Sequence, residues 1–223
     1  PAPFTVPDGQ RIGEIWFEPP PALDALLAKY IFTSEKLSVQ VHPSDAQTEA
    51  AGLGRQGKEE CWLVLDAQPG ARLGIGFAEP LDGDTLRAAA LDGSIEERLA
   101  WHEVQAGDFF YIPANTVHAI GGGISLIEVQ QNSDITYRLY DYGRPRELHL
   151  DKAVSVAQAG PYPAQYRGRA GGRGEQVLVD GPYFQLIRLD GPPSAQALDT
   201  FDRAALLMPI DGGVIAGAER VEA

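Results

Sequence analysis

Cysteine, basic residues and long apolar runs are all scarce in this sequence. The single cysteine, Cys61, excludes an internal disulfide and a cysteine-based metal site, so any metal must use nitrogen and oxygen ligands. Eighteen Lys and Arg residues against 31 Asp and Glu give a formal net charge of −13, which opposes general binding to nucleic acid or anionic membranes. No run approaches the roughly 20 apolar residues that span a bilayer, and the opening PAPFTVPDGQRIGEIW lacks the apolar run and basic flank of a secretory signal. These absences predict a soluble, cytoplasmic protein without nucleic-acid or membrane partners.

Short β-patterned runs make up most of what the sequence does contain. With 223 residues, 44% of them hydrophobic, the chain can bury a full-sized core as one large or two small domains. Gly and Pro recur between runs rich in Val, Ile, Phe, Tyr and Trp, which predicts an all-β jelly roll or sandwich. We expect strands at residues 36–42, 59–66, 72–77, 108–112, 116–120, 124–130 and 135–141. Helical insertions are expected at 21–31, at 44–54 with Ser44 or Asp45 as N-cap, and at 83–100 with a break at Gly93.

A change of composition near residue 157 predicts a division of the chain. Residues 1–156 hold the expected strands, whereas residues 157–176, AQAGPYPAQYRGRAGGRGEQ, are rich in Gly, Pro and Arg, as is typical of a linker. Residues 177–223 resume β-patterned runs but offer too few strands to close a barrel alone. We therefore expect a second β unit there that is either incomplete or completed by strands of the first unit. Whether the chain forms a homodimer is left open.

Polar side chains recur on one face of two expected strands. In SVQVHPSD (38–45), Gln40 and His42 project to the same side because side chains alternate along a strand. In GKEECWLVL (57–65), Glu60 shares a face with Trp62, whereas Glu59 faces the other way and is expected to be exposed. One of the two carboxylates must then face the core.

A further candidate, His118, follows a turn in AGDFFYIPANTVHAIGGG (106–123). A buried carboxylate is costly without a cation, whereas a single histidine is usually a hydrogen-bonded structural residue, as we expect for His102 and His149. One divalent ion could take nitrogen and oxygen donors from the set Gln40, His42, Glu60 and His118. Two imidazoles with a carboxylate and an open position suit a catalytic zinc, although iron, manganese or nickel would accept the same atoms.

The spacing of Gly107, Pro113 and His118 resembles the second signature of the cupin superfamily. Asn115 stands where that signature usually has Gly, and Asn is the commonest substitute in a turn that requires positive φ. The sequence matches the first cupin signature only in part. Gln40 stands in place of its first His, and a helical insertion separates His42 from Glu60. The resemblance implies a cupin jelly-roll barrel, or double-stranded β-helix, but names no reaction.

A larger set of motifs resembles one enzyme family. LSVQVHPSD, GKEECW, GDFFYIPANTVHAIGGG, IEVQQNSDITYRLYDYGR and RELHLDKA together are similar to type I mannose-6-phosphate isomerases of the short bacterial form, over roughly residues 11–153. The resemblance implies interconversion of mannose 6-phosphate and fructose 6-phosphate through a cis-enediol. It also implies one zinc ion per chain, held by Gln40, His42, Glu60 and His118.

The same resemblance implies roles for further polar residues. Arg138, in TYRLYDYG, matches the family's catalytic Arg and would hold a developing enediolate or the phosphate; its structural alternative is an ion pair with Glu128 or Asp134. Glu128 and Asp134 match acidic residues near the family's site and are candidates to move the proton, as is Lys58 if burial depresses its pKa. The substrate-binding positions that match are Ser38 and Lys29.

Two other functions stay open at the level of sequence. A non-catalytic sugar-phosphate sensor would keep the metal and the pocket without turnover. A different cupin enzyme, such as an iron dioxygenase, would hold iron and consume oxygen. The presence of Arg138 and Lys58 beside the full ligand set favours the isomerase, because a sensor has less need of every catalytic group.

Overall fold

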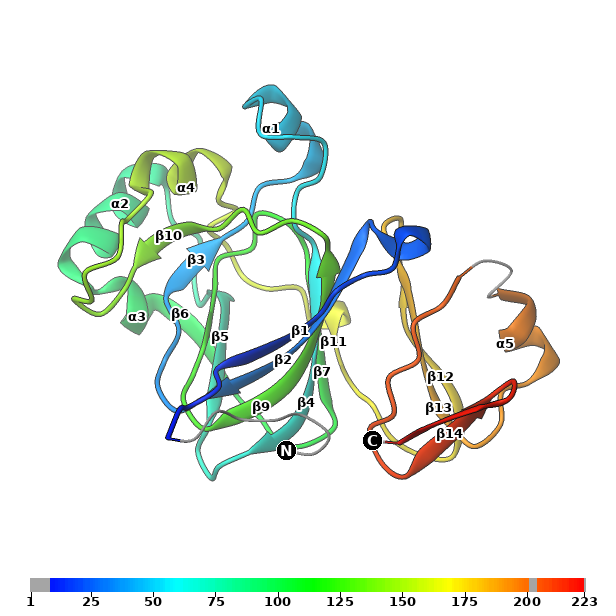
Figure 1. Ribbon diagram of the computed structural model, residues 1–223. Helices are drawn as coiled ribbons and strands as arrows, with labels where there is room; N and C mark the ends of the chain where they lie inside the picture. The colour runs from blue at the N-terminus through cyan, green and yellow to red at the C-terminus, as the bar shows by residue number, and fades with distance from the viewer. Residues whose placement is uncertain (1–8, 201–203, 223) are drawn as a thin grey trace.

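Two antiparallel β-sheets face each other and form a barrel (Figure 1). The structure is a computed structural model that describes residues 9–200 and 204–222. The six-stranded sheet has the order β1 (Glu14–Phe17), β2 (Leu26–Thr33), β9 (Ile124–Gln131), β4 (Glu60–Ala67), β7 (Asp108–Ile112) and β11 (Arg167–Arg169). The five-stranded sheet has the order β10 (Tyr137–Tyr140), β3 (Val39–Val41), β8 (His118–Ile120), β5 (Arg72–Phe77) and β6 (Leu99–Glu103).

The barrel interior is divided into an apolar part and a polar part. Large apolar side chains from both sheets fill the apolar part, among them Trp62, Phe110 and Leu126 from one sheet and Leu73 and Ile75 from the other. The inward positions nearer the end of β3 and the start of β4 carry the polar residues of the motifs. Alternation along β4 explains the change, because Glu60, Trp62 and Val64 face inward, as predicted, while Cys61 and Leu63 pack outside.

Helices cover the outer face of the five-stranded sheet (Figure 1). They are α2 (Gly83–Asp92), α3 (Ile95–Arg98) and α4 (Leu150–Val156). Leu86 and Ala89 of α2 pack with Val41 and Leu139 of the sheet. The expected break at Gly93 is confirmed, since this residue ends α2 in the left-handed conformation, with φ of 85°.

A short excursion carries α1 (Asp45–Ala50) away from one end of the barrel (Figure 1). Ser44 caps the helix in a capping box with Gln47, so the expected N-cap is confirmed. The excursion leaves the barrel after β3 and returns to it at β4. It therefore separates His42 from Glu60 along the chain.

Two β-hairpins lie beside the six-stranded sheet (Figure 1). They are formed by β12 (Gly174–Asp180) with β13 (Gln185–Asp190) and by β14 (Gly213–Ala216) with β15 (Glu219–Glu222); η2 (Ala164–Tyr166) and α5 (Ala195–Thr200) are the helical turns of this part. Val179 and Phe184 pack on Cys61, Leu63 and Phe109 of the barrel. The expected linker, residues 157–176, holds η2 and also β11, which pairs with β7 at the edge of the barrel sheet. The division into units stays a prediction.

The expected helix at 21–31 is wrong. The segment forms a single turn, η1 (Pro21–Leu23), and then the strand β2, which pairs with β9 along its whole length and also with β1. The apolar run LLAKYI suits either a helix or a buried strand, and pairing on both sides satisfies its backbone groups in the sheet. Several elements, among them β1, β6, α4 and β11, were not predicted. In the described part of the chain, no helix has the length and apolar character needed to cross a bilayer.

Candidate metal centre and active site

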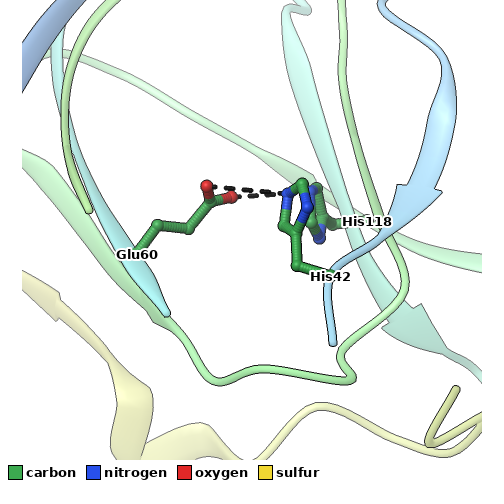
Figure 2. Close-up of side chains that lie close together, drawn as sticks. All are labelled: His42, Glu60 and His118. Carbon is green, nitrogen blue, oxygen red and sulfur yellow. Dashed lines mark ion pairs between the residues drawn. The ribbon is translucent and has the colours of Figure 1, made fainter. Parts of the chain in front are cut away.

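Three of the four expected metal ligands meet inside the barrel (Figure 2). His42 follows β3, His118 begins β8, and Glu60 begins β4 of the facing sheet. Glu60 Oε2 lies 3.7 Å from His42 Nε2, and Glu60 Oε1 lies 3.4 Å from His118 Nε2. One potential ligand atom from each residue lies within 4.8 Å of the other two, and all three side chains are buried. Closure of the barrel thus brings together donors that are far apart in the sequence.

Backbone carbonyls fix the tautomers of both histidines. His42 Nδ1 lies 2.8 Å from Ile135 O, and His118 Nδ1 lies 2.9 Å from Thr116 O. A carbonyl only accepts, so each Nδ1 carries the hydrogen and each Nε2 presents a lone pair toward Glu60. Burial is the main cause that lowers the pKa of both imidazoles, which keeps them neutral. Neutral imidazoles held in this way have the form that binds a metal ion.

The Glu60 carboxylate completes the donor set. Burial alone would raise its pKa, but the surrounding positive charges, above all the Lys58 ammonium 2.6 Å from Oε2, together outweigh burial and lower the pKa. Both Glu60 oxygens are buried and neither accepts a hydrogen bond, although Oε2 forms the ion pair with Lys58. A buried carboxylate oxygen without a donor, facing two imidazole lone pairs, fits a divalent cation.

Gln40 lies beside this cluster. Its Cα partner on β8 is His118, and its Nε2 lies 3.3 Å from His118 Nε2. Its Oε1 accepts a hydrogen bond of 3.0 Å from the Ser38 hydroxyl, and Ser38 is itself buried. The amide nitrogen therefore faces the cluster, and rotation of the amide would present its oxygen there instead.

Glu128 joins the two expected lysines in a buried ion network. Glu128 Oε1 lies 3.1 Å from Lys29 Nζ and 3.6 Å from Lys58 Nζ. Trp62 Nε1 donates to Glu128 Oε2 at 3.0 Å, a contact that sequence reasoning missed although GKEECW places Trp62 on the face of Glu60. Because each buried charge has an opposite charge within reach, the network avoids the cost of isolated buried ions.

The environment of Lys58 does not favour the neutral amine that a general base requires. Burial alone would lower its pKa, but Glu128 and Glu60 more than compensate and raise it. The condition under which Lys58 was a candidate base, a depressed pKa, is therefore not met. Lys58 Nζ also lies 3.3 Å from His42 Nε2, so its ammonium is part of the polar cavity.

Arg138 and Asp134 lie toward the edge of the site. Arg138 is the Cα partner of Gln40, so both project to the same face of the sheet. Its Nη1 donates to Glu147 O at 2.9 Å, and its buried Nε has no partner. Among the described residues, neither Glu128 nor Asp134 forms the ion pair that was the structural alternative for Arg138. Asp134 is exposed, and none of the contacts in the described ranges joins it to the cluster.

Two other residues of the motifs differ from expectation. Glu59 was expected to be exposed, but it is half-buried on the outer side of the barrel and accepts a hydrogen bond from the Tyr111 hydroxyl. In an unbroken strand Tyr140 would share a face with Arg138. A register shift between Arg138 and Tyr140 turns Tyr140 toward the helical layer instead, because an extra residue inverts the alternation. His102, on β6, and His149, before α4, lie outside the metal cluster, and His149 Nδ1 accepts from the Arg138 backbone N–H.

Comparisons with known proteins give one consistent result. No protein-family model matches the chain. Mannose-6-phosphate isomerase ManA of Bacillus subtilis is 42% identical over 147 residues, which are 63% of this chain and 46% of that protein. Mannose-6-phosphate isomerase of Streptococcus mutans is 39% identical over 175 residues, which are 73% of this chain and 54% of that protein. This chain thus spans about half the length of the curated relatives that it matches.

Solved structures agree with these relatives. The crystal structure of the mannose 6-phosphate isomerase from Bacillus subtilis has a TM-score of 0.63 at 34% identity, covering 73% of this chain and 54% of that one. A zinc-bound mannose 6-phosphate isomerase shares the fold, with a TM-score of 0.55 at 16% identity over 73% of this chain and 62% of that one. The predicted all-β cupin barrel is confirmed. The predicted resemblance is confirmed as well: over the matched residues, this chain is homologous to the type I mannose-6-phosphate isomerases.

Proposed function

We propose that the barrel is a zinc-dependent aldose-ketose isomerase that interconverts mannose 6-phosphate and fructose 6-phosphate through a cis-enediol. The observation that carries the proposal is the buried cluster of His42, Glu60 and His118, in which neither carboxylate oxygen accepts a hydrogen bond. Homology supplies the reaction, since the relatives bear the name mannose-6-phosphate isomerase.

The metal would be held by His42, Glu60 and His118, with Gln40 as the fourth protein ligand. The fixed Nε2 lone pairs and the acceptor oxygen of Glu60 suit one Zn²⁺ per chain. When bound, Zn²⁺ would supply Lewis-acid polarisation of the sugar's carbonyl and hydroxyl oxygens. The zinc-bound isomerase of the same fold is consistent with this choice of metal.

The remaining polar groups of the cavity would move the proton and hold the intermediate charge. Glu128 is the favoured group to carry the proton between C1 and C2, because its carboxylate is buried and borders both lysines. Lys58, held as an ammonium, would stabilise negative charge on the enediolate. Asp134 is the less favoured candidate to carry the proton, because its side chain is exposed.

The phosphate would lie toward Arg138, Lys29 and Ser38. A protein with net charge −13 needs a local cationic pocket for an anionic sugar, and two of its four lysines point into this cavity. Arg138 adds a guanidinium that matches phosphate geometry. We infer that residues 1–156 form the catalytic unit, because every residue given a role lies within them.

The test is a coupled assay of fructose 6-phosphate formation from mannose 6-phosphate, with metal content measured in the same sample. We expect about one zinc per chain, turnover that a chelator abolishes, and recovery when Zn²⁺ is returned. Zinc and sugar phosphate bound without turnover would overturn the isomerase in favour of the sensor. Bound iron with oxygen consumption would instead favour a dioxygenase.

A further inference from the structure

The excursion that carries α1 lies between two residues of the candidate metal site. The chain leaves the barrel after His42 and returns at Lys58 and Glu60, so residues 43–57 form a loop whose two ends must stay together (Figure 1). A loop of this length does not hold its own ends at a fixed separation, because closing it costs conformational entropy. Besides the pairing of β3 and β4 in their sheets, the 3.7 Å between His42 Nε2 and Glu60 Oε2 therefore depends on the neck of the loop, where residues 43–45 meet residues 57–59.

Backbone contacts close this neck on one side. Lys58 N donates to Pro43 O at 3.0 Å, and Gly57 lies so close that a Cβ there would be 2.3 Å from Pro43 O. The two chain segments are thus in direct contact next to the site. Only glycine fits at position 57 without moving the backbone of Pro43 and the residues that follow it.

One carboxylate oxygen closes the neck on the other side. Asp45 Oδ1 accepts from Gly57 N at 2.7 Å and from Gln131 Nε2 at 2.9 Å. Gln131 is buried at the end of β9 and bonds to Glu59 twice. Its side-chain Oε1 accepts a hydrogen bond of 2.9 Å from Glu59 N, and its backbone N–H donates one of 3.0 Å to Glu59 O. The Asp45 carboxylate and the Gln131 amide therefore join the end of β3, the start of β4 and the end of β9.

These three segments carry most of the polar cavity. His42 lies three residues before Asp45, Glu60 follows Glu59 directly, and Glu128 lies three residues before Gln131. We propose that Asp45 is a positioning residue, which acts through Gly57 and Gln131 to set the spacing of His42, Glu60 and Glu128. The role rests on the proposed metal-dependent function, but its primary readout is metal affinity and not turnover.

A purely structural role for Asp45 predicts something different. Asp45 is the acidic residue in the first turn of α1, where it would also favour the helix end electrostatically. Removing a helix-end charge would lower the stability of the excursion without a specific effect on the metal. Asp84, the acidic residue in the first turn of α2, provides the matched control.

The experiment compares Zn²⁺ affinity of the wild-type chain with Asp45→Ala, Asp45→Asn and Asp84→Ala, by competition with a chromophoric chelator. We expect Asp45→Ala to weaken Zn²⁺ binding by about 10-fold to 100-fold, the range found when residues that orient metal ligands are removed. Asp45→Asn keeps the acceptor oxygen for Gly57 N and should lose much less. Asp84→Ala should bind Zn²⁺ like the wild type.

Equal affinity of Asp45→Ala and wild type would overturn the proposal, and so would a loss in Asp45→Asn as large as in Asp45→Ala. If Asp45→Ala does not fold, Gln131→Met breaks the same connection from the other side and should show the same loss of affinity. Wild-type chain that binds Zn²⁺ but does not isomerise the sugar would overturn the proposed reaction and leave the affinity comparison intact. Wild-type chain that binds no Zn²⁺ would overturn both.

Discussion

Glu60 meets three nitrogen groups inside the barrel, yet neither of its buried oxygens accepts a hydrogen bond. A buried acceptor without a donor costs about 1–3 kcal/mol, and more when it is charged. The Lys58 ammonium offsets part of that cost, and a metal ion between the imidazoles would offset the rest. This balance explains why a carboxylate stands at an inward position of β4 where an apolar residue would otherwise pack.

The metal proposal predicts a specific result for His118→Ala. The variant should lose bound zinc and isomerase activity together, because His118 Nε2 faces Glu60 with its lone pair free. Metal analysis of the purified variant measures this directly. His102→Ala is the control, since His102 lies outside the cluster and its loss should leave the metal content unchanged. Stoichiometric zinc in His118→Ala would show that the residue is not a ligand.

Arg138→Ala should separate chemistry from metal binding. The side chain projects to the face of Gln40 but belongs to no part of the three-residue metal cluster, so zinc content and folding should be retained. If the guanidinium holds the enediolate or the phosphate, kcat should fall by about 100-fold to 1,000-fold. Steady-state kinetics on metal-replete protein measure the effect. A kcat equal to that of the wild type would remove Arg138 from the mechanism.

At the scale of elements, the loop after β10 is held by an ion cluster outside the site. Asp141 is almost fully buried and accepts hydrogen bonds from Arg144 and Arg146, at distances of 2.6–3.1 Å. Burial alone would raise the pKa of this carboxyl, but the two arginines outweigh burial and lower it. Asp141 therefore links the end of β10, the strand that carries Arg138, to the segment before α4.

This cluster predicts a pH-dependent contribution to stability. The pKa of Asp141 is lower in the folded chain than the unfolded value of about 3.9, so its contribution is present above that pH and is lost as pH falls through the folded pKa. Asp141→Asn should lower the free energy of unfolding at pH 7 by about 1–2 kcal/mol, since the arginines are partly exposed and screened. Urea unfolding of both proteins at pH 7 and pH 3 measures it. The difference should narrow at pH 3, and a constant difference would contradict the assignment.

Several elements could be predicted from sequence because a local signal decides them. Ser44 with Gln47 gives a capping box, Gly93 ends α2, and Asn115 adopts φ of 72° in the turn before β8, as its place in the signature predicts. The helix expected at 21–31 failed because its apolar run carries no local signal that excludes a strand. Pairing with the neighbouring strands β1 and β9 makes this segment a strand, and the local sequence carries no information about those partners.

At the scale of the whole molecule, the candidate site could be predicted only in part. Alternation placed Gln40 and His42 on one face and put Glu60 inward, and barrel closure then brought His118 to them. The direction of the pKa shift of Lys58 could not be predicted, because it depends on two carboxylates from different strands. The neck formed by Asp45, Gly57 and Gln131 could not be predicted for the same reason, because its contacts join three separate segments of the chain.

The charge of the molecule makes a final prediction about its ligand. The net charge of −13 repels a sugar phosphate at long range. Binding must therefore come from the buried lysines and Arg138, which act over a short range. A ligand at 100 times its Kd stabilises a protein by about 2.7 kcal/mol, which for a chain of this size raises Tm by roughly 5–10 °C. Fructose 6-phosphate should give such a shift in thermal unfolding, and fructose at the same concentration should give far less. Inorganic phosphate, as the control, should give a smaller shift than the complete sugar phosphate. Equal shifts with fructose and fructose 6-phosphate would mean that the cavity has no phosphate site.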